Sequence, residues 1–148
     1  MRSKKPKGRL YLAARFSRRE ELRGYARRLR EVGYIVDCAW LSDQASGTNC
    51  LDYERLSEEQ ARCVAIQDCA DIREADAVLL FTDGSASPYS RGGHHFEAGY
   101  AQGLGKPVVV VGPLENVFHR LSGLEWFYNF EVLADIIGLP PEEEDDAS

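Results

Sequence analysis

The chain has 148 residues, of which 44% are hydrophobic and 28% are charged, the balance of an ordinary globular domain. Apolar runs such as Val108–Val111 are far too short to cross a bilayer. The basic N-terminal segment has neither the apolar stretch nor the cleavage site of a secretory signal, so we expect a cytoplasmic protein with no membrane partner.

The net charge of −6 conceals two regions of opposite sign. Residues 1–30 carry twelve Lys and Arg against two Glu, whereas residues 31–148 carry six against twenty-two acidic residues. Because the basic segment is short and an acidic body would repel a polyanion, we expect no polynucleotide partner. Binding of a single phosphate group stays open.

The composition along the chain predicts one domain with two tails. We expect a basic tail over 1–8, a single α/β catalytic domain over 9–139 and a disordered acidic tail over 140–148. The four cysteines form no C-x-x-C pair, so we expect reduced thiols and no zinc site. They are Cys38, Cys50, Cys63 and Cys69.

In the first half of the chain, the run Arg9–Ala14 predicts a buried strand. A helix with Ser17 as its N-cap follows and ends at Gly33, and residues 34–40 predict a second strand. Residues 41–57 are polar and predict a long loop.

The second half continues the alternation of helices and strands. Ser57 and Gln60 occupy capping-box positions ahead of a helix, and "DAVLLFTD" predicts the third strand. A helix over "HHFEAGYAQGLG", a strand over "KPVVVVG", a short fifth strand near Trp126 and a last helix over "NFEVLADIIG" complete the pattern.

This order predicts a small doubly wound domain, flavodoxin-like or Rossmann-like, with a five-stranded parallel sheet flanked by helices. Ligands of such sheets bind beyond the carboxyl ends of the strands. The polar segments at that edge are Ala14–Arg18, Ala39–Ser57, Thr82–Glu97 and Gly112–His119.

The first of these segments has the features of an anion site. The small side chain of Ala13 admits a ligand close to the backbone, Ser17 begins a helix, and Arg15 adds positive charge. The alternative is a capped helix with a solvated basic face, and the residues alone do not separate the two.

The stretch "GGHHFEAG" carries the stronger signal. Gly93 allows a tight turn, and Glu97 follows within about the first turn of a helix, where the dipole favours its ionised form. Glu97 is then either a dipole partner or a nucleophile. The adjacent His94 and His95 are expected to diverge on the helix, so we predict no metal site. Asp68 is either a surface charge or an acid that reaches the crevice.

At these residues the chain resembles the nucleoside 2-deoxyribosyltransferase family, which includes relatives that hydrolyse nucleoside 5′-monophosphates. The resemblance runs from about Arg9 to Ile137. It rests on "LYLAARF", "QDCADIREADAVLLF" and "GGHHFEAGYAQGLGKPVVVV", of which the last block is the most specific.

The resemblance implies catalytic roles for three residues. Glu97 matches the glutamate that attacks C1′, Tyr11 the tyrosine that orients it, and Asp68 the acid associated with the departing base. It also implies substrate contacts. Arg15 and Ser17 match the 5′-phosphate site of the hydrolases, and Asn116 lies near a segment that reaches a neighbouring subunit's site.

The sequence departs from the family pattern just before the nucleophile. Many relatives carry D-x-G-[ST]-x-x-E, whereas here Arg91 stands at the acid position and His94 at the Ser/Thr position. Asp83 is a candidate replacement for the missing carboxylate. Arg91 and His94 favour a substrate that bears a phosphate or another acidic group.

The resemblance implies double displacement through a glycosyl–Glu97 ester, no cofactor and a homodimer or larger homo-oligomer. The substrate is then a small-molecule nucleoside or nucleotide. Three functions stay open: transfer of the sugar between bases, hydrolysis of a nucleoside 5′-monophosphate, and nucleotide sensing without turnover. An aligned nucleophile argues against the third.

Overall fold

The strands of the sheet are short, and the side chains of the first three are apolar and largely buried, whereas those of the fourth are more exposed. In the computed structural model, which describes residues 5–42, 56–83 and 92–142, they form a parallel sheet with four strands among these residues. The order is β1 (Leu10–Ala13), β2 (Ala77–Phe81), β3 (Val108–Val111) and β4 (Glu125–Phe127). This arrangement confirms the α/β fold class, with one strand fewer than predicted.

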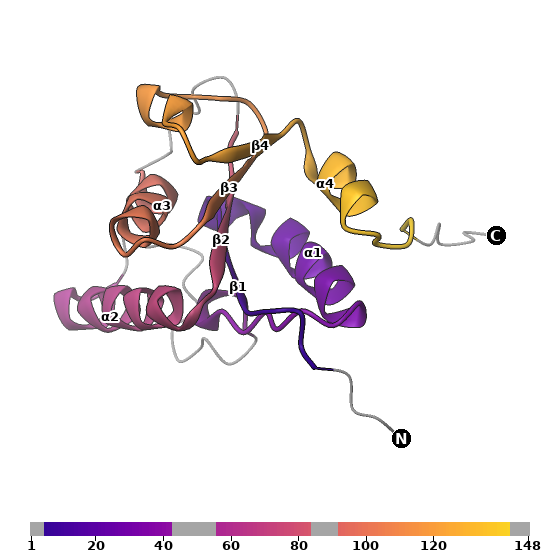
Figure 1. Ribbon diagram of the computed structural model, residues 1–148. Helices are drawn as coiled ribbons and strands as arrows, with labels where there is room; N and C mark the ends of the chain where they lie inside the picture. Colours follow the sequence, from indigo (N-terminus) through magenta and orange to yellow (C-terminus); the bar gives the residue numbers. More distant parts are fainter. Residues whose placement is uncertain (1–4, 43–55, 84–91, 143–148) are drawn as a thin grey trace.

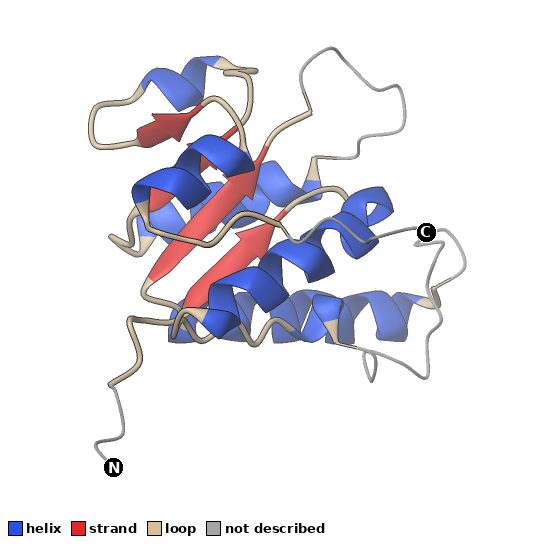
Figure 2. Ribbon diagram, turned by 90° about the vertical axis from the view of Figure 1, so that its right-hand side faces the viewer, coloured by secondary structure: helices blue, strands red, loops and turns tan. Residues whose placement is uncertain are grey.

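Helices cover both faces of the sheet (Figure 1). Helices α1 (Arg19–Glu31) and α4 (Phe130–Ile136) lie on one face, and α2 (Glu58–Glu74) and α3 (Gly93–Gly103) lie on the other. Figure 2 shows the sheet from a direction turned by 90°. Helix α3 packs on β1 and β2 and beside α2, so side chains from these elements meet on that face.

The predicted strand over residues 34–40 does not form. Ile35 makes one isolated parallel bridge with Arg9, and residues Ala39–Leu41 then turn as the 3-10 helix η2. Side chains take the place of a ladder, because Trp40 Nε1 donates to the Leu12 carbonyl at 2.9 Å and the Leu12 amide contacts Cys38 Sγ at 3.5 Å. Together with the backbone bonds of Ile35, these contacts pair backbone groups along the edge of β1 without a further strand there.

The predicted start of the first helix is also corrected. Residues Phe16–Arg18 form the 3-10 turn η1, and α1 begins only at Arg19, with Arg18 at the N-cap and no side-chain cap. Ser17 is exposed and is not the N-cap. The end is as predicted, since the helix stops at Glu31 and Gly33 has a φ of 107°.

The capping signal predicted for α2 is confirmed, and α4 also has a side-chain cap. Ser57 and Gln60 form the predicted capping box of α2, with contacts of 2.9 and 3.1 Å. Asn129 caps α4 through its bond with the Val132 amide at 2.9 Å. The predicted fifth strand near Trp126 corresponds to β4, and the 3-10 turn η4 (Val117–Arg120) precedes it.

The core lies between the sheet and its helices. Its largest fully buried side chains include Tyr11, Phe81 and Ile72. Burial raises the pKa of the Cys38 thiol to about 12, so this thiol stays protonated. In the described part of the chain, no helix has the length and apolar character needed to cross a bilayer.

Some predictions fall outside the described residues. They are Arg91, Cys50, most of the loop predicted over 41–57, and the outer parts of both predicted tails, 1–4 and 143–148.

Candidate active site

A buried tyrosine and a glutamate meet between β1 and α3. Tyr11 is 1% exposed, and its phenol donates a hydrogen bond to Glu97 Oε2. Burial, followed by the negative charge of Glu97, holds the pKa of Tyr11 well above its ordinary value. The phenol therefore stays protonated and remains a donor. The structure brings together these two predicted site residues, which lie 86 positions apart in the sequence.

Asp68 of α2 belongs to the same group. Its partly buried carboxyl has a pKa raised to about 7, first by burial and then by the negative charge of Asp71. The negative charge of Asp68 in turn raises the pKa of both Tyr11 and Glu97. Asp68 is thus partly buried rather than a fully solvated surface charge.

Glu97 is held in a different state from the one that the sequence suggested. It is the fifth residue of α3, and the first turn of that helix contains no acidic residue. Burial raises the pKa of Glu97 to about 8, the Tyr11 hydrogen bond opposes this shift, and Asp68 adds to it. The helix dipole acts mainly within the first turn, so desolvation outweighs it here. At neutral pH the carboxyl of the free protein is largely protonated.

The glycines before α3 make the expected tight turn. Gly92 is the N-cap with a φ of 80°, and its carbonyl accepts bonds from the amides of His95 and Phe96, each at 3.1 Å. Gly93 is exposed, and a Cβ built there would meet no atom within 4 Å among the described residues. This end of the helix therefore leaves space beside the backbone.

The segment after β1 holds two arginines against one carboxylate. Arg15 Nε lies 3.7 Å from Asp83 Oδ2, and Arg18 donates to Asp83 Oδ1 at 3.2 Å and to the Thr82 carbonyl at 3.0 Å. The structure thus places Asp83 as an anchor for cations. Ala13 is completely buried, so it is not exposed to a ligand, whereas Ser17 is exposed.

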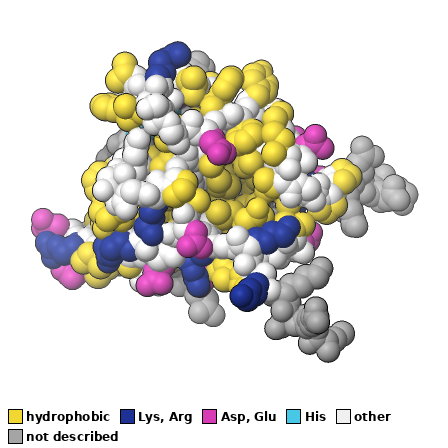
Figure 3. Space-filling view, in the orientation of Figure 1, with side chains coloured by type: hydrophobic (Ala, Val, Ile, Leu, Met, Phe, Trp, Pro, Cys, Tyr) yellow, Lys and Arg dark blue, Asp and Glu magenta, His cyan; other side chains and the backbone are white. Residues whose placement is uncertain are grey.

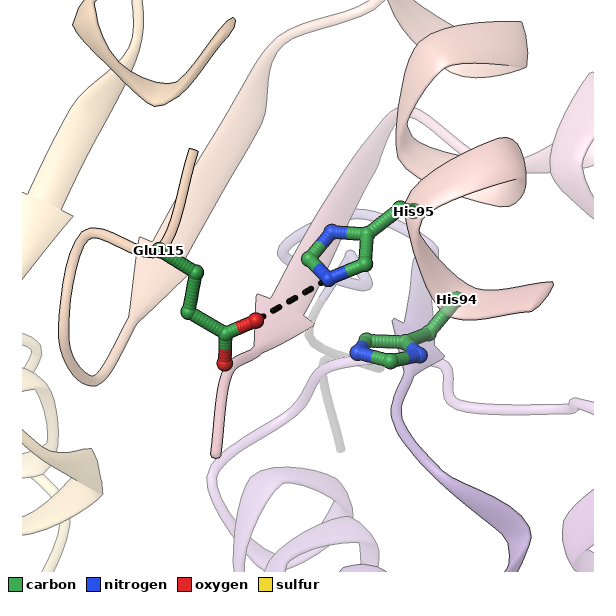
Figure 4. Close-up of side chains that lie close together, drawn as sticks. All are labelled: His94, His95 and Glu115. Atoms are coloured by element: carbon green, nitrogen blue, oxygen red, sulfur yellow. Dashed lines mark hydrogen bonds and ion pairs between the residues drawn. The ribbon is translucent and has the colours of Figure 1, made fainter. Parts of the chain in front are cut away.

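A third group lies where the first turn of α3 faces the loop after β3 (Figure 4). His95 Nε2 is 3.0 Å from Glu115 Oε2. The rings of His94 and His95 lie with centroids 4.1 Å apart, so the expectation that these side chains diverge is wrong. Burial, and then the charge of His95, lowers the pKa of His94 to about 4, so His94 is neutral at pH 7. The sequence analysis missed Glu115, although it lies in one of the four polar segments.

Asn116 has a local structural role in the described residues. Its side-chain oxygen accepts from the Phe118 amide at 2.9 Å and so caps η4, while its Nδ2 lies 3.5 Å from His95 Nδ1. Asn116 is therefore part of the loop that faces α3, next to Glu115.

A hollow of about 230 Å³ lies elsewhere, between β1 and α2. It is lined by Arg9, Leu10, Tyr11, Asp37, Cys38, Asp71 and Glu74. It shares Tyr11 with the acidic group but does not include Glu97 or Asp68, and it is smaller than most small-molecule sites. The convergence of ionisable side chains marks the candidate site better than this hollow does.

Comparison with solved structures places the fold among known enzymes. A 2-deoxyribosyltransferase from Bacillus psychrosaccharolyticus is 22% identical, with a TM-score of 0.61, over 92% of this chain and 98% of that one. The Clostridium botulinum CMP N-glycosidase BcmB is 21% identical, with a TM-score of 0.55, over 88% and 99% of the two chains. A 2-desoxiribosyltransferase from Leishmania mexicana is 17% identical, with a TM-score of 0.52, over 88% and 97%.

A search among curated proteins gave no significant match. The sequence profile described as nucleoside 2-deoxyribosyltransferase, however, matches residues 10–133, which is most of the chain. The matched region includes β1, α2 and α3, which carry Tyr11, Asp68 and Glu97. The chain belongs to the nucleoside 2-deoxyribosyltransferase family of enzymes.

Proposed function

We propose that this enzyme cleaves the N-glycosidic bond of a deoxynucleoside or its 5′-monophosphate and transfers the sugar to another base through a covalent glycosyl–Glu97 intermediate. One observation carries the proposal: Glu97 is partly buried, bonded to the phenol of Tyr11 and subject to the negative charge of a second acid, Asp68. A surface carboxylate that only partners a helix dipole needs neither of these neighbours.

The reaction divides into two displacements at C1′. In the first, a carboxylate oxygen of Glu97 bonds to C1′ while the C1′–N bond breaks. The electron pair of the broken bond goes to the base nitrogen. Asp68 gives its proton to that nitrogen or to a conjugated position of the base. In the second, a nitrogen of the acceptor base bonds to C1′, the C1′–Oε bond breaks, and a proton returns to Asp68. Two inversions give overall retention.

The acid pair supports this division of roles. Tyr11 acts as a positioning residue, because its hydrogen bond fixes one Glu97 oxygen and leaves the other for attack. The raised pKa values, about 7 for Asp68 and about 8 for Glu97, mean that the pair loses its protons near neutral pH. The productive form has one proton, on Asp68, and it is the minor of the two singly protonated forms because Glu97 has the higher pKa. We therefore expect a bell-shaped dependence of rate on pH.

Hydrolysis of a 5′-monophosphate is the second candidate. It is favoured by Arg15 and Arg18, which lie together after β1 beside Asp83. In that case water replaces the acceptor base in the second displacement. Because Asp83 already neutralises part of this charge, a phosphate would have to compete with it for the guanidinium groups.

The deciding experiment is chromatography of products from deoxynucleosides and their 5′-monophosphates, each with and without a second free base. A new nucleoside that forms only with the acceptor base supports transfer. Free sugar or sugar phosphate without an acceptor supports hydrolysis. Wild-type protein that gives no product with any compound, in samples that are folded by circular dichroism, contradicts both candidates.

A homo-oligomer is part of the proposal. Apolar side chains gather over β4 and the segments beside it (Figure 3). Val117 is 75% exposed, Phe118 66% and Tyr128 71%, which is unusual for side chains of this size. A second copy of the chain that covers them would bring the Asn116 loop into an interface. Light scattering at several concentrations checks this, and a monomer under assay conditions contradicts it.

A further inference from the structure

Among the described residues, His94, His95 and Glu115 form a group whose ligand atoms all lie within 4.8 Å of one another. The two histidines come from the first turn of α3, and Glu115 comes from the loop between β3 and η4 (Figure 4). We infer that these three side chains form a binding site for a divalent transition-metal ion of the zinc class. The inference is independent of the reaction proposed above.

The donor set suits such an ion. Two imidazole nitrogens and one carboxylate oxygen are ligands that zinc and its neighbours prefer, whereas magnesium and calcium prefer oxygen alone. Bonds of about 2.0–2.1 Å to a tetrahedral ion place ligand atoms roughly 3.3 Å apart. The pair of His95 Nε2 and Glu115 Oε2, at 3.0 Å, is already close to that separation.

His94 supplies a second observation that points to a ligand. Its side chain is 2% exposed, and its Nε2 atom is buried without a hydrogen-bond partner. The nearest acid, Asp83, lies 3.7 Å away and is already engaged by Arg15 and Arg18. A buried nitrogen without a partner is costly, and coordination of an ion would satisfy it.

The surroundings hold the group in place and balance its charge. The Glu115 amide donates to His119 Nδ1 at 3.0 Å, and Glu115 Oε1 accepts a hydrogen bond from the Asp83 amide. Such outer contacts orient the ligands of metal sites. Glu115 and Asp83 supply negative charge, against the positive charges of Arg15 and Arg18.

Three protein ligands leave a fourth position for water or a bound anion. An ion there would join the first turn of α3 to the β3–η4 loop. It would do so one helical turn before Glu97.

The test is a calorimetric titration of the tag-free full chain with Zn²⁺. The variants His95→Ala and Glu115→Gln are titrated in the same way. We expect one ion per chain and a loss of affinity in each variant well beyond the roughly tenfold that an outer contact costs. Both substitutions are at partly exposed side chains, so the fold should survive, which circular dichroism checks. Zn²⁺ should also raise the melting temperature of the wild type and not of the variants.

Cysteines are the competing ligands, and Cys63 is the matched control. It is exposed and lies 3.9 Å from Glu59 Oε1 on α2, so it offers an alternative zinc site. Cys63→Ser should bind Zn²⁺ as the wild type does. Co²⁺ substituted for Zn²⁺ should show weak d–d bands without thiolate-to-cobalt absorption. Strong thiolate absorption, unchanged binding in folded His95→Ala and Glu115→Gln, or no binding by the wild type would each overturn the inference.

Discussion

Two clusters share helix α3 and hold their ionisable groups in opposite ways. In the acidic cluster, burial and then the negative charge of a neighbouring acid raise the pKa values of both Glu97 and Asp68. In the charged cluster, Asp83 is paired with two arginines, and Glu115 is paired with His95. A carboxyl with a raised pKa near neutral pH is suited to exchanging protons, whereas a paired carboxylate is suited to holding charge.

The largest expected effect separates the clusters by chemistry. Glu97→Gln should lower kcat by at least about 10⁴-fold, because a nucleophile acts as a unit with its partners. Turnover of the most active substrate measures this. Glu59→Gln, at an exposed acid of α2, is the control and should keep wild-type activity. Near-normal turnover by folded Glu97→Gln would refute the covalent mechanism.

Asp68→Asn comes next, with an expected loss in kcat of about 10²- to 10⁴-fold, the usual contribution of a general acid. The pH profile should lose its descending limb. Its ascending limb should remain, because that limb requires only the deprotonation of Glu97. Asp71→Asn is the matched control: it should shift the descending limb to lower pH, since Asp71 raises the pKa of Asp68. An unchanged profile in Asp68→Asn would exclude it as the acid.

Tyr11→Phe should lower the rate less than Asp68→Asn does, and it should displace the ascending limb. Loss of a hydrogen bond to a charged group costs about 1.5–3 kcal/mol, or roughly 10- to 100-fold in rate. Because the Tyr11 bond lowers the pKa of Glu97, its removal should move the ascending limb to higher pH. Rate measurements across pH distinguish this from simple loosening, which would lower the rate without moving the limb.

Arg15→Gln probes the charged cluster. If a 5′-phosphate binds after β1, the variant should raise KM for a 5′-monophosphate about tenfold, the effect of one charge-assisted contact. The KM for the matching unphosphorylated nucleoside should stay within about twofold, which serves as the internal control. Equal changes for both substrates would place the phosphate elsewhere.

The smallest effect concerns stability rather than rate. Glu97 and Asp68 have folded pKa values above their ordinary ones, so the stability they contribute is full below about pH 4 and is lost as pH rises through about 7 to 8. The free energy of unfolding of Glu97→Gln, relative to that of the wild type, should therefore rise by more than about 1 kcal/mol between pH 5 and pH 8.5. Urea unfolding at both pH values measures the difference. An exposed acid changed in the same way, Glu59→Gln, should show no such gain.

Much of the fold was predictable because its signals are local. The capping box of Ser57 and Gln60, the end of α1 at Gly33 and the aliphatic strands all act over a few neighbouring residues. Residues 34–40 read as a strand for the same reason. Only the side chains of Cys38 and Trp40, bonded along the edge of β1, explain why they do not form one.

The sequence by itself determined the α/β class, the capping box of α2, the end of α1 and the residue types that gather after the strands. The tertiary structure alone decided the state of those residues. The pKa of Glu97 depends on burial and on Tyr11 and Asp68, and the neighbourhood of Glu115 depends on how the β3–η4 loop meets α3. The reason is physical: capping and strand formation depend on adjacent residues, whereas desolvation and charge coupling depend on side chains that only folding brings together.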